Sequence, residues 1–216
     1  MQTVGADGDD RGRSFIEAAR RDQIVTAAIA TIAAEGFARA SFVRIAERAS
    51  ISPALITYHF KTKDKLIGAV LDQVGSRLDS AMEGGPEPVA SYEDGLRRIL
   101  TGHVLHCVRA PEDMAARREI GTAASSPAIR RRIAEQQETG RAELAAFLAE
   151  GQREGEFREF DPDAFAGAML AAMQAVPGEL RRRPADAGED YARELAGIFV
   201  TAAIGRGWEG GPEGDR

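Results

Sequence analysis

The sequence predicts an all-α protein of about nine helices. Apolar residues recur every three or four positions through most of the 216 residues, and no run alternates Val, Thr or Tyr with polar residues as a strand would. Serine or aspartate followed by proline marks three helix starts, at Ser52-Pro53, Ser126-Pro127 and Asp161-Pro162. The composition, 44% hydrophobic but only 6% aromatic, agrees with a helical core of small and aliphatic side chains.

The first helix is predicted over about residues 20–35. Ile24, Ala28 and Ile32 share one face of it, and Gly36 ends it. Residues 1–13 are rich in Gly and Asp and contain no apolar segment. We therefore expect a disordered arm there, and no secretory signal.

Two short helices are predicted next, over residues 42–49 and 53–60. Ser41 and Ser52 occupy their N-cap positions, where a hydroxyl accepts a hydrogen bond from an early amide. On the second helix, Ile56 and Phe60 are four residues apart and point inward. The opposite face is small and polar at its start and aromatic and cationic at its end, with Pro53, Ala54, Thr57, Tyr58 and Lys61.

Two helices joined by a tight turn, here Ser50-Ile51, can place the second helix in the major groove of DNA. Lys61, Lys63 and Lys65, which are all the lysines of the chain, follow directly. Residues 11–66 carry ten basic and five acidic side chains, although the whole chain has a net charge of −6. A basic part on an acidic chain orients a protein on a polyanion.

The predicted partner of this segment is therefore double-stranded DNA. We expect Pro53, Ala54 and Thr57, just after Ser52, to meet base edges. Hydroxyl, aromatic and cationic side chains before and after them are expected to meet phosphates. These are Ser41, Arg44, Tyr58, His59, Lys61 and Lys63.

This segment resembles the DNA-binding domain of the TetR family of transcriptional regulators. The motif that usually ends this domain in the family is largely present here, in Ser52, Ile56, Tyr58-His59-Phe60, Lys63 and Leu66. Gly36-Phe37 also fits the end of the family's first helix. The close match covers about residues 20–70. Three residues depart from the pattern: Thr57 replaces an aromatic residue, Ser50 a glycine, and Arg44 a more usual acid.

The resemblance implies a transcriptional regulator, in particular a repressor that a small-molecule effector releases from a near-palindromic operator. Six further helices are predicted over about residues 64–82, 92–109, 111–125, 127–154, 161–176 and 190–206. The expected domains are a helix-turn-helix domain over residues 14–66, an effector-binding and dimerisation domain over 67–207 and a flexible tail over 208–216.

The last two predicted helices contain small residues, including Ala166, Gly167, Gly197 and Ala202, which allow close helix contact. The TetR-like plan implies that these helices pair with those of a second subunit in a four-helix bundle, forming a homodimer. The alternative is that the small residues pack within one subunit.

The resemblance also implies an effector site among the later helices. Met and Phe line adaptable apolar pockets, but at helical spacing they also build ordinary cores. His103 and His106 are three residues apart, a spacing that metal ligands use, yet no third ligand is evident, so we predict neither metal nor cofactor. The candidates are His103, His106, Cys107, Met114, Phe147, Phe165, Met169, Met173 and Gln174.

Other functional classes find little support in the sequence. There is no Gly-rich phosphate loop, Gly-x-Ser-x-Gly elbow or His-Glu-x-x-His pair, so we do not expect an enzyme. No run of 18 uncharged apolar residues predicts a membrane span, and the single cysteine excludes an internal disulfide. We therefore expect a cytoplasmic protein. The alternative function is a helical ligand-binding or adaptor protein whose helix-turn-helix no longer reads DNA.

Overall fold

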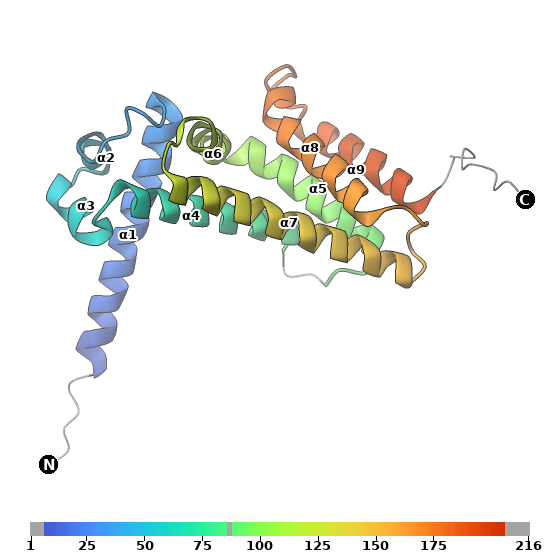
Figure 1. Ribbon diagram of the computed structural model, residues 1–216, viewed down its shortest axis with the longest axis horizontal. Helices are drawn as coiled ribbons and strands as arrows, with labels where there is room; N and C mark the ends of the chain where they lie inside the picture. The colour runs from blue at the N-terminus through green and yellow to red at the C-terminus, as the bar shows by residue number, and fades with distance from the viewer. Residues whose placement is uncertain (1–6, 86–87, 206–216) are drawn as a thin grey trace, which may run out of the picture. The chain divides into compact units, whose positions relative to one another are not determined.

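The computed structural model describes residues 7–85 and 88–205, which form nine α-helices and no strand (Figure 1). The prediction of an all-α fold is confirmed over these residues. The helices are α1 (Asp7–Glu35), α2 (Phe42–Ala49), α3 (Pro53–Phe60), α4 (Lys63–Glu83), α5 (Tyr92–Arg109), α6 (Pro111–Ala123), α7 (Pro127–Arg153), α8 (Pro162–Leu180) and α9 (Gly188–Ile204).

Helix α1 begins earlier than the sequence pattern predicts. It includes residues 7–13, where we expected a disordered arm, whereas residues 1–6 lie outside the described part of the chain. No proline interrupts residues 7–35, and extending an existing helix costs much less than starting one. The expected tail over residues 208–216 also lies outside the described residues.

The chain divides into two compact units. The first comprises the residues up to Gly75 together with Glu112–Ile133, and the second comprises Ser76–Pro111 and the chain from Ala134 onward. The first unit therefore extends beyond the boundary expected at residue 66. The reason is that Val70 and Val74 of α4 are buried in the same core as α1, and Ile120 of α6 joins them.

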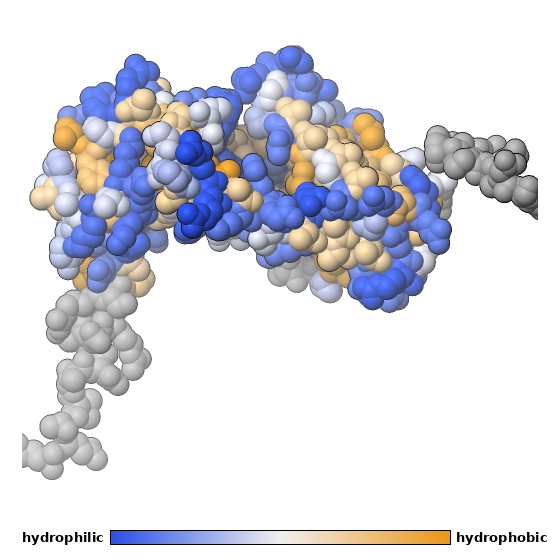
Figure 2. Space-filling view, in the orientation of Figure 1, coloured by the Kyte–Doolittle hydropathy of each residue, from blue (hydrophilic) through white to orange (hydrophobic). Residues whose placement is uncertain are grey.

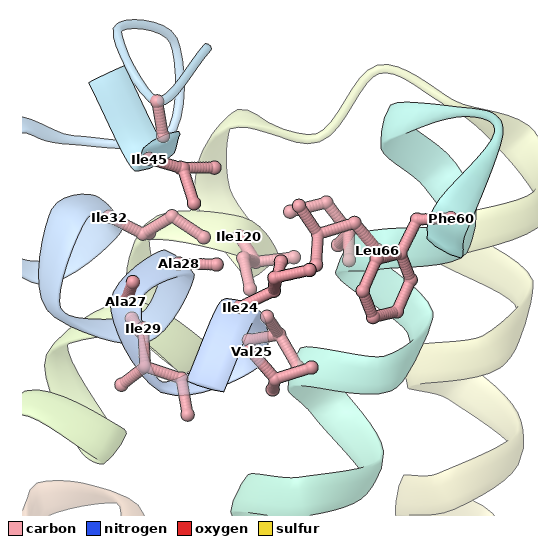
Figure 3. Close-up of a cluster of buried hydrophobic side chains, with 14 of the residues drawn as sticks. Ile24, Val25, Ala27, Ala28, Ile29, Ile32, Ile45, Phe60, Leu66 and Ile120 are labelled. Atoms are coloured by element: carbon pink, nitrogen blue, oxygen red, sulfur yellow. The ribbon is translucent and has the colours of Figure 1, made fainter. Parts of the chain in front are cut away.

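The core of the first unit gathers side chains from six helices, α1, α2, α3, α4, α6 and the start of α7. Figure 3 shows Ile24, Ile45, Phe60, Leu66 and Ile120 directed toward a common centre. Each of these side chains is almost fully removed from solvent. Burying a large aliphatic or aromatic side chain contributes roughly 1.5–3 kcal/mol, so this cluster fixes the position of the two short helices.

The second unit is built around α5, which contacts both α8 and α9. Leu96, Leu100 and Val104 of α5 are buried, as are Leu195 and Val200 of α9. On α9 the buried positions recur every three or four residues, which leaves the opposite face of the helix exposed.

Helix α8 continues past a proline where the sequence predicts an end near Val176. Pro177 has no N–H, so the carbonyl of Met173 lacks its usual helical donor. Nε2 of His103, on α5, donates a hydrogen bond of 2.9 Å to that carbonyl instead. A side chain from a neighbouring helix thus replaces the missing bond, and α8 extends to Leu180.

We expect the replacement His103→Leu to lower the free energy of unfolding by about 1–2 kcal/mol, because it leaves the buried Met173 carbonyl without this donor. The same replacement should cost less in a Pro177→Ala background, because alanine restores the N–H. Urea unfolding of the four proteins of this double-mutant cycle measures the difference. Equal costs in both backgrounds would show that the histidine does not substitute for the helical donor.

Candidate nucleic-acid interface

The two short helices begin at the N-caps that the sequence predicts. The Ser41 hydroxyl accepts a hydrogen bond from the backbone N–H of Arg44 at 3.3 Å. The Ser52 hydroxyl accepts one from the N–H of Leu55, also at 3.3 Å, and Pro53 is the first residue of α3. Both caps satisfy amides that have no partner within the helix.

The turn between α2 and α3 contains a non-glycine residue whose backbone is in the left-handed conformation. Ser50 has φ of 54°, a region that glycine adopts more readily. Its N–H bonds the Glu47 carbonyl, and the N–H of Ile51 bonds the Ala46 carbonyl. These bonds satisfy the last carbonyls of α2 and hold the turn in place.

One face of α3 lies open to solvent while the other is buried. Ile56 and Phe60 are in the core, whereas Pro53, Ala54 and Thr57 are exposed. The Thr57 hydroxyl donates to the Pro53 carbonyl at 3.2 Å, which leaves its methyl group on the outer surface of the helix. The side chains at the start of this face are small, so the helix backbone can approach base edges closely.

The end of the same face is aromatic and cationic. Tyr58 is 62% exposed, and its ring meets that of half-buried His59 edge-on at 5.1 Å. Nζ of the exposed Lys61 lies 5.0 Å from the centre of the Tyr58 ring. Tyr58 and Lys61 thus form a joint surface that offers a hydroxyl and an ammonium to a phosphate.

Three long polar side chains bind the carbonyls at the ends of three helices. Arg21 donates to the His59 carbonyl near the end of α3, and Gln23 donates to that of Ala49, the last residue of α2, each at 3.0 Å. The guanidinium of Arg21 also lies over the Phe60 ring, 4.5 Å from its centre. These contacts fix both short helices to α1. Arg21 and Gln23 were not predicted to have this role, although their position beside buried Ile24 is where polar side chains can reach the rim of a core.

Lys63, which the sequence predicts to contact phosphate, is the third of these side chains. Its ammonium donates to the carbonyl of Phe37, just after α1, at 3.0 Å and lies 4.5 Å from the centre of the Phe37 ring. Burial lowers the pKa of this amine below its usual value. Lys63 therefore holds the end of α1, and a phosphate contact by its ammonium would compete with this bond.

Arg44 is also engaged within the protein. Its guanidinium lies 3.0 Å from carboxylate oxygens of both Glu35 and Glu47. The hydrogen bond between Arg44 and Glu35 raises the pKa of the arginine and lowers that of the glutamate. A phosphate contact by Arg44 would require exchanging these ion pairs. The structure thus brings Pro53, Ala54, Thr57, Tyr58 and Lys61 together on one exposed face, apart from Arg44 and Lys63.

The same residues match a known family. Residues 24–70, from the middle of α1 to α4, match the family described as bacterial regulatory proteins, tetR family. The match covers α2, α3 and the turn whose geometry places the open face of α3 outward.

Over these residues the chain is similar to the TetR family.

Curated proteins with this similarity are transcriptional regulators. The chain is 31% identical over 93 residues to the HTH-type transcriptional regulator BetI of Stenotrophomonas maltophilia, a match covering 41% of the chain and 45% of BetI. It is 42% identical over 67 residues to an HTH-type transcriptional repressor of Mycobacterium tuberculosis, a match covering 31% of the chain and 34% of the repressor. The chain therefore spans less than half the length of these curated relatives.

Solved structures extend the similarity to the whole fold. A TetR-family regulator from Rhodococcus sp. is similar with a TM-score of 0.72 and 26% identity, covering 84% of this chain and 98% of that one. The regulator FadR of Bacillus subtilis, solved with stearoyl-CoA, shares the fold with a TM-score of 0.69 at 18% identity, covering 83% of this chain and 97% of FadR.

The candidate effector residues differ in burial and in the unit to which they belong. His103, His106, Cys107, Met169 and Met173 are buried in the second unit, and burial raises the pKa of the Cys107 thiol to about 11. Three others are dispersed: Met114 belongs to the first unit, Gln174 is exposed, and Phe165 stacks on Phe160 at 4.5 Å.

Phe147 differs from the other candidates because it lines an open hollow of about 730 Å³ in the second unit. Tyr92 lies beside it, with ring centres 5.4 Å apart. Among the described residues, no helix is long and apolar enough to cross a membrane, and no group of three or more His, Cys, Asp or Glu could hold a metal ion.

Proposed function

We propose that this protein is a DNA-binding transcriptional regulator of the TetR family, acting as a repressor on a near-palindromic operator. The observation that carries the proposal is the exposed face of α3, which is small at Pro53, Ala54 and Thr57 and ends in Tyr58 and Lys61. The starts of α2 and α3 are both capped, and Arg21 of α1 binds a carbonyl near the end of α3. The face of α3 is therefore held in place for the major groove before DNA binds. Such a protein acts in the cytoplasm, with the chromosome.

The proposed assembly is a homodimer formed through α8 and α9. The buried residues of α8 leave Ala164, Gly167, Ala168 and Ala171 exposed on its outer face. Ile198 of α9 is 62% exposed. Figure 2 shows hydrophobic residues gathered over α8, bordered by hydrophilic ones. Such a face supports close packing of two helix pairs in a four-helix bundle, which would present two copies of α3 to two half-sites.

An effector that releases the protein must bind the released state more tightly than the DNA-bound state. By linkage, it then lowers the affinity for operator DNA by the same factor by which DNA lowers the affinity for the effector. We propose that the effector binds in the second unit.

The α3 assignment predicts two different defects. Tyr58→Ala should weaken binding to all DNA sequences by about tenfold, because it removes a non-specific contact and the support of Lys61. Thr57→Ala should instead change the preference among operator variants that differ at one base pair. Fluorescence anisotropy with DNA from upstream of the gene, at two salt concentrations, measures both effects.

Arg153→Ala is the matched control, since Arg153 is an exposed cation on α7 in the second unit. It should leave DNA affinity unchanged. If the Thr57 and Tyr58 variants bound like the control and the parent, α3 would not be the reading helix.

A further inference from the structure

The hollow beside Phe147 has an aromatic floor that two glycines make possible. A Cβ at Gly95 of α5 would stand 2.9 Å from the Phe147 ring, so only a residue without a side chain lets that ring lie against α5. A Cβ at Gly102 would stand 2.1 Å from the Ala81 carbonyl oxygen, so the end of α4 also approaches α5 closely. The ring of Phe157 meets that of Phe147 at 6.4 Å and supports it.

The rim of the hollow is strongly acidic. Asp79 and Glu83 come from the end of α4, Glu143 from α7, and Glu156 from the segment after α7. Glu143 precedes Phe147 by one helical turn, so both side chains lie on the same face of α7. The carboxylate of Glu156 is held in place because it accepts a hydrogen bond from the N–H of Glu93 at 3.1 Å.

Arg98 also lines the hollow, and its guanidinium binds other groups of the protein. The guanidinium of Arg98 pairs with the Asp94 carboxylate at 2.9 Å and donates to the Pro88 carbonyl at 3.2 Å. The hydrogen bond from the N–H of Ala90, and then that from the Arg98 guanidinium, lower the pKa of Asp94. The lining therefore offers four carboxylates around an aromatic floor, with its one arginine already paired.

We infer that this hollow binds an amphipathic organic cation, that is, an ammonium group attached to an apolar body. The faces of Tyr92 and Phe147 attract a cation through their ring quadrupoles, and carboxylates such as Glu143 add a long-range attraction. Met82 and Ile99 offer apolar surface to the body of the ligand. The volume of about 730 Å³ lies within the roughly 300–1,000 Å³ of small-molecule sites, whereas an anion would meet only repulsion from the rim.

This inference deepens the proposed function, because it names the chemical class of the effector. It rests on that function only for the effect on DNA. Binding of the cation to the free protein is a property of the hollow alone, so the two ideas can fail separately.

The test uses benzyltrimethylammonium chloride as the probe, with benzyl alcohol and phenylacetate as neutral and anionic comparisons. Isothermal titration of the full-length protein without DNA should give one site per chain for the cation and affinities at least tenfold weaker for the other two. The affinity for the cation should fall with rising salt, since part of the attraction is screened.

Two variants locate the site. The double variant Asp79→Asn, Glu143→Gln should weaken cation binding about five- to 20-fold, and Phe147→Leu about three- to 30-fold. Glu135→Gln is the matched control, because Glu135 is an exposed carboxylate on α7 that does not line the hollow. It should bind the probe like the parent. The double variant changes only exposed carboxylates, so circular dichroism should show that its fold is unchanged.

Equal binding of the three probes, no binding of the cation, or an equal loss in the Glu135 control would overturn the inference. In a parallel titration, operator affinity is measured with and without saturating benzyltrimethylammonium. A parent protein that binds operator but not the cation would refute the cation site alone. One that binds the cation but no DNA would refute the regulatory function alone.

Discussion

Replacing Ile198 by aspartate is expected to convert the protein from a dimer into monomers and to weaken operator binding about 100- to 10,000-fold. Ile198 is 62% exposed on the outer face of α9. In the proposed dimer this side chain is buried against the partner, so an aspartate there would place a charge in an apolar interface without a compensating partner. Two linked reading helices gain affinity from effective concentration, and a monomer loses that gain.

The periodicity of α9 explains why this replacement should leave the subunit folded. Ala192, Leu195, Ala196, Val200 and Ala203 are buried at intervals of three or four residues. Ile198 lies between these positions and faces away from them. A change there therefore leaves the packing of α9 on α5 intact.

Ile16→Asp is a closely matched control, because Ile16 of α1 is 63% exposed and undergoes the same chemical change. Analytical ultracentrifugation should show monomers for the Ile198 variant and dimers for the parent and the Ile16 variant. Circular dichroism should show the same helix content in all three. A dimeric Ile198→Asp protein with parental operator affinity would rule out this face as the interface.

The parts of the fold that follow from local chemistry were predictable from the sequence. Ser41, and Ser52 followed by Pro53, start helices through bonds to residues three positions away, and such bonds depend on nothing distant in the chain. The same holds for the inward direction of Ile56 and Phe60, which follows from a spacing of four. These local rules located both short helices and the exposed face of α3.

The roles of individual cations were not predictable, because they depend on long-range contacts. Lys63 meets the carbonyl of Phe37, 26 positions away, and Arg44 meets Glu35 from another helix. The continuation of α8 past Pro177 depends on His103, 70 positions from the Met173 carbonyl that it binds. Nothing in the local sequence of either partner indicates such pairs, so the sequence predicts the same phosphate contact for Lys61 and Lys63.

The position of the hollow was missed for a similar reason. Most of the effector candidates predicted on the later helices are Met, Phe and His, and several of these side chains build the core. The hollow instead combines the end of α4, the start of α5 and part of α7 around Phe147. Gly95 and Gly102, which shape it, carry no chemical signal in the sequence because their function is to leave room.

Replacing Lys63 by methionine is expected to lower the free energy of unfolding by about 1.5–3 kcal/mol, because it removes a charge-assisted hydrogen bond to the Phe37 carbonyl. Methionine keeps an apolar stem against the Phe37 ring, so the loss reports mainly on the ammonium. Lys61→Met is the matched control, since Lys61 is exposed and its ammonium lies over Tyr58. It should change the free energy of unfolding by less than about 0.5 kcal/mol.

In DNA binding the two lysine variants should show the opposite pattern: the Lys61 variant should be affected and the Lys63 variant should not. In the proposed complex, Lys61→Met lowers the slope of log affinity against log salt by about 0.9, the value expected for one lost phosphate contact. Lys63→Met should leave that slope unchanged, because its ammonium binds the protein and not the phosphate. Urea unfolding and anisotropy titrations over a range of salt concentrations give both quantities for each variant. A lowered slope at parental stability for Lys63→Met would mean that this ammonium leaves the Phe37 carbonyl to bind DNA, and that the end of α1 is held by the apolar contacts of Phe37 alone.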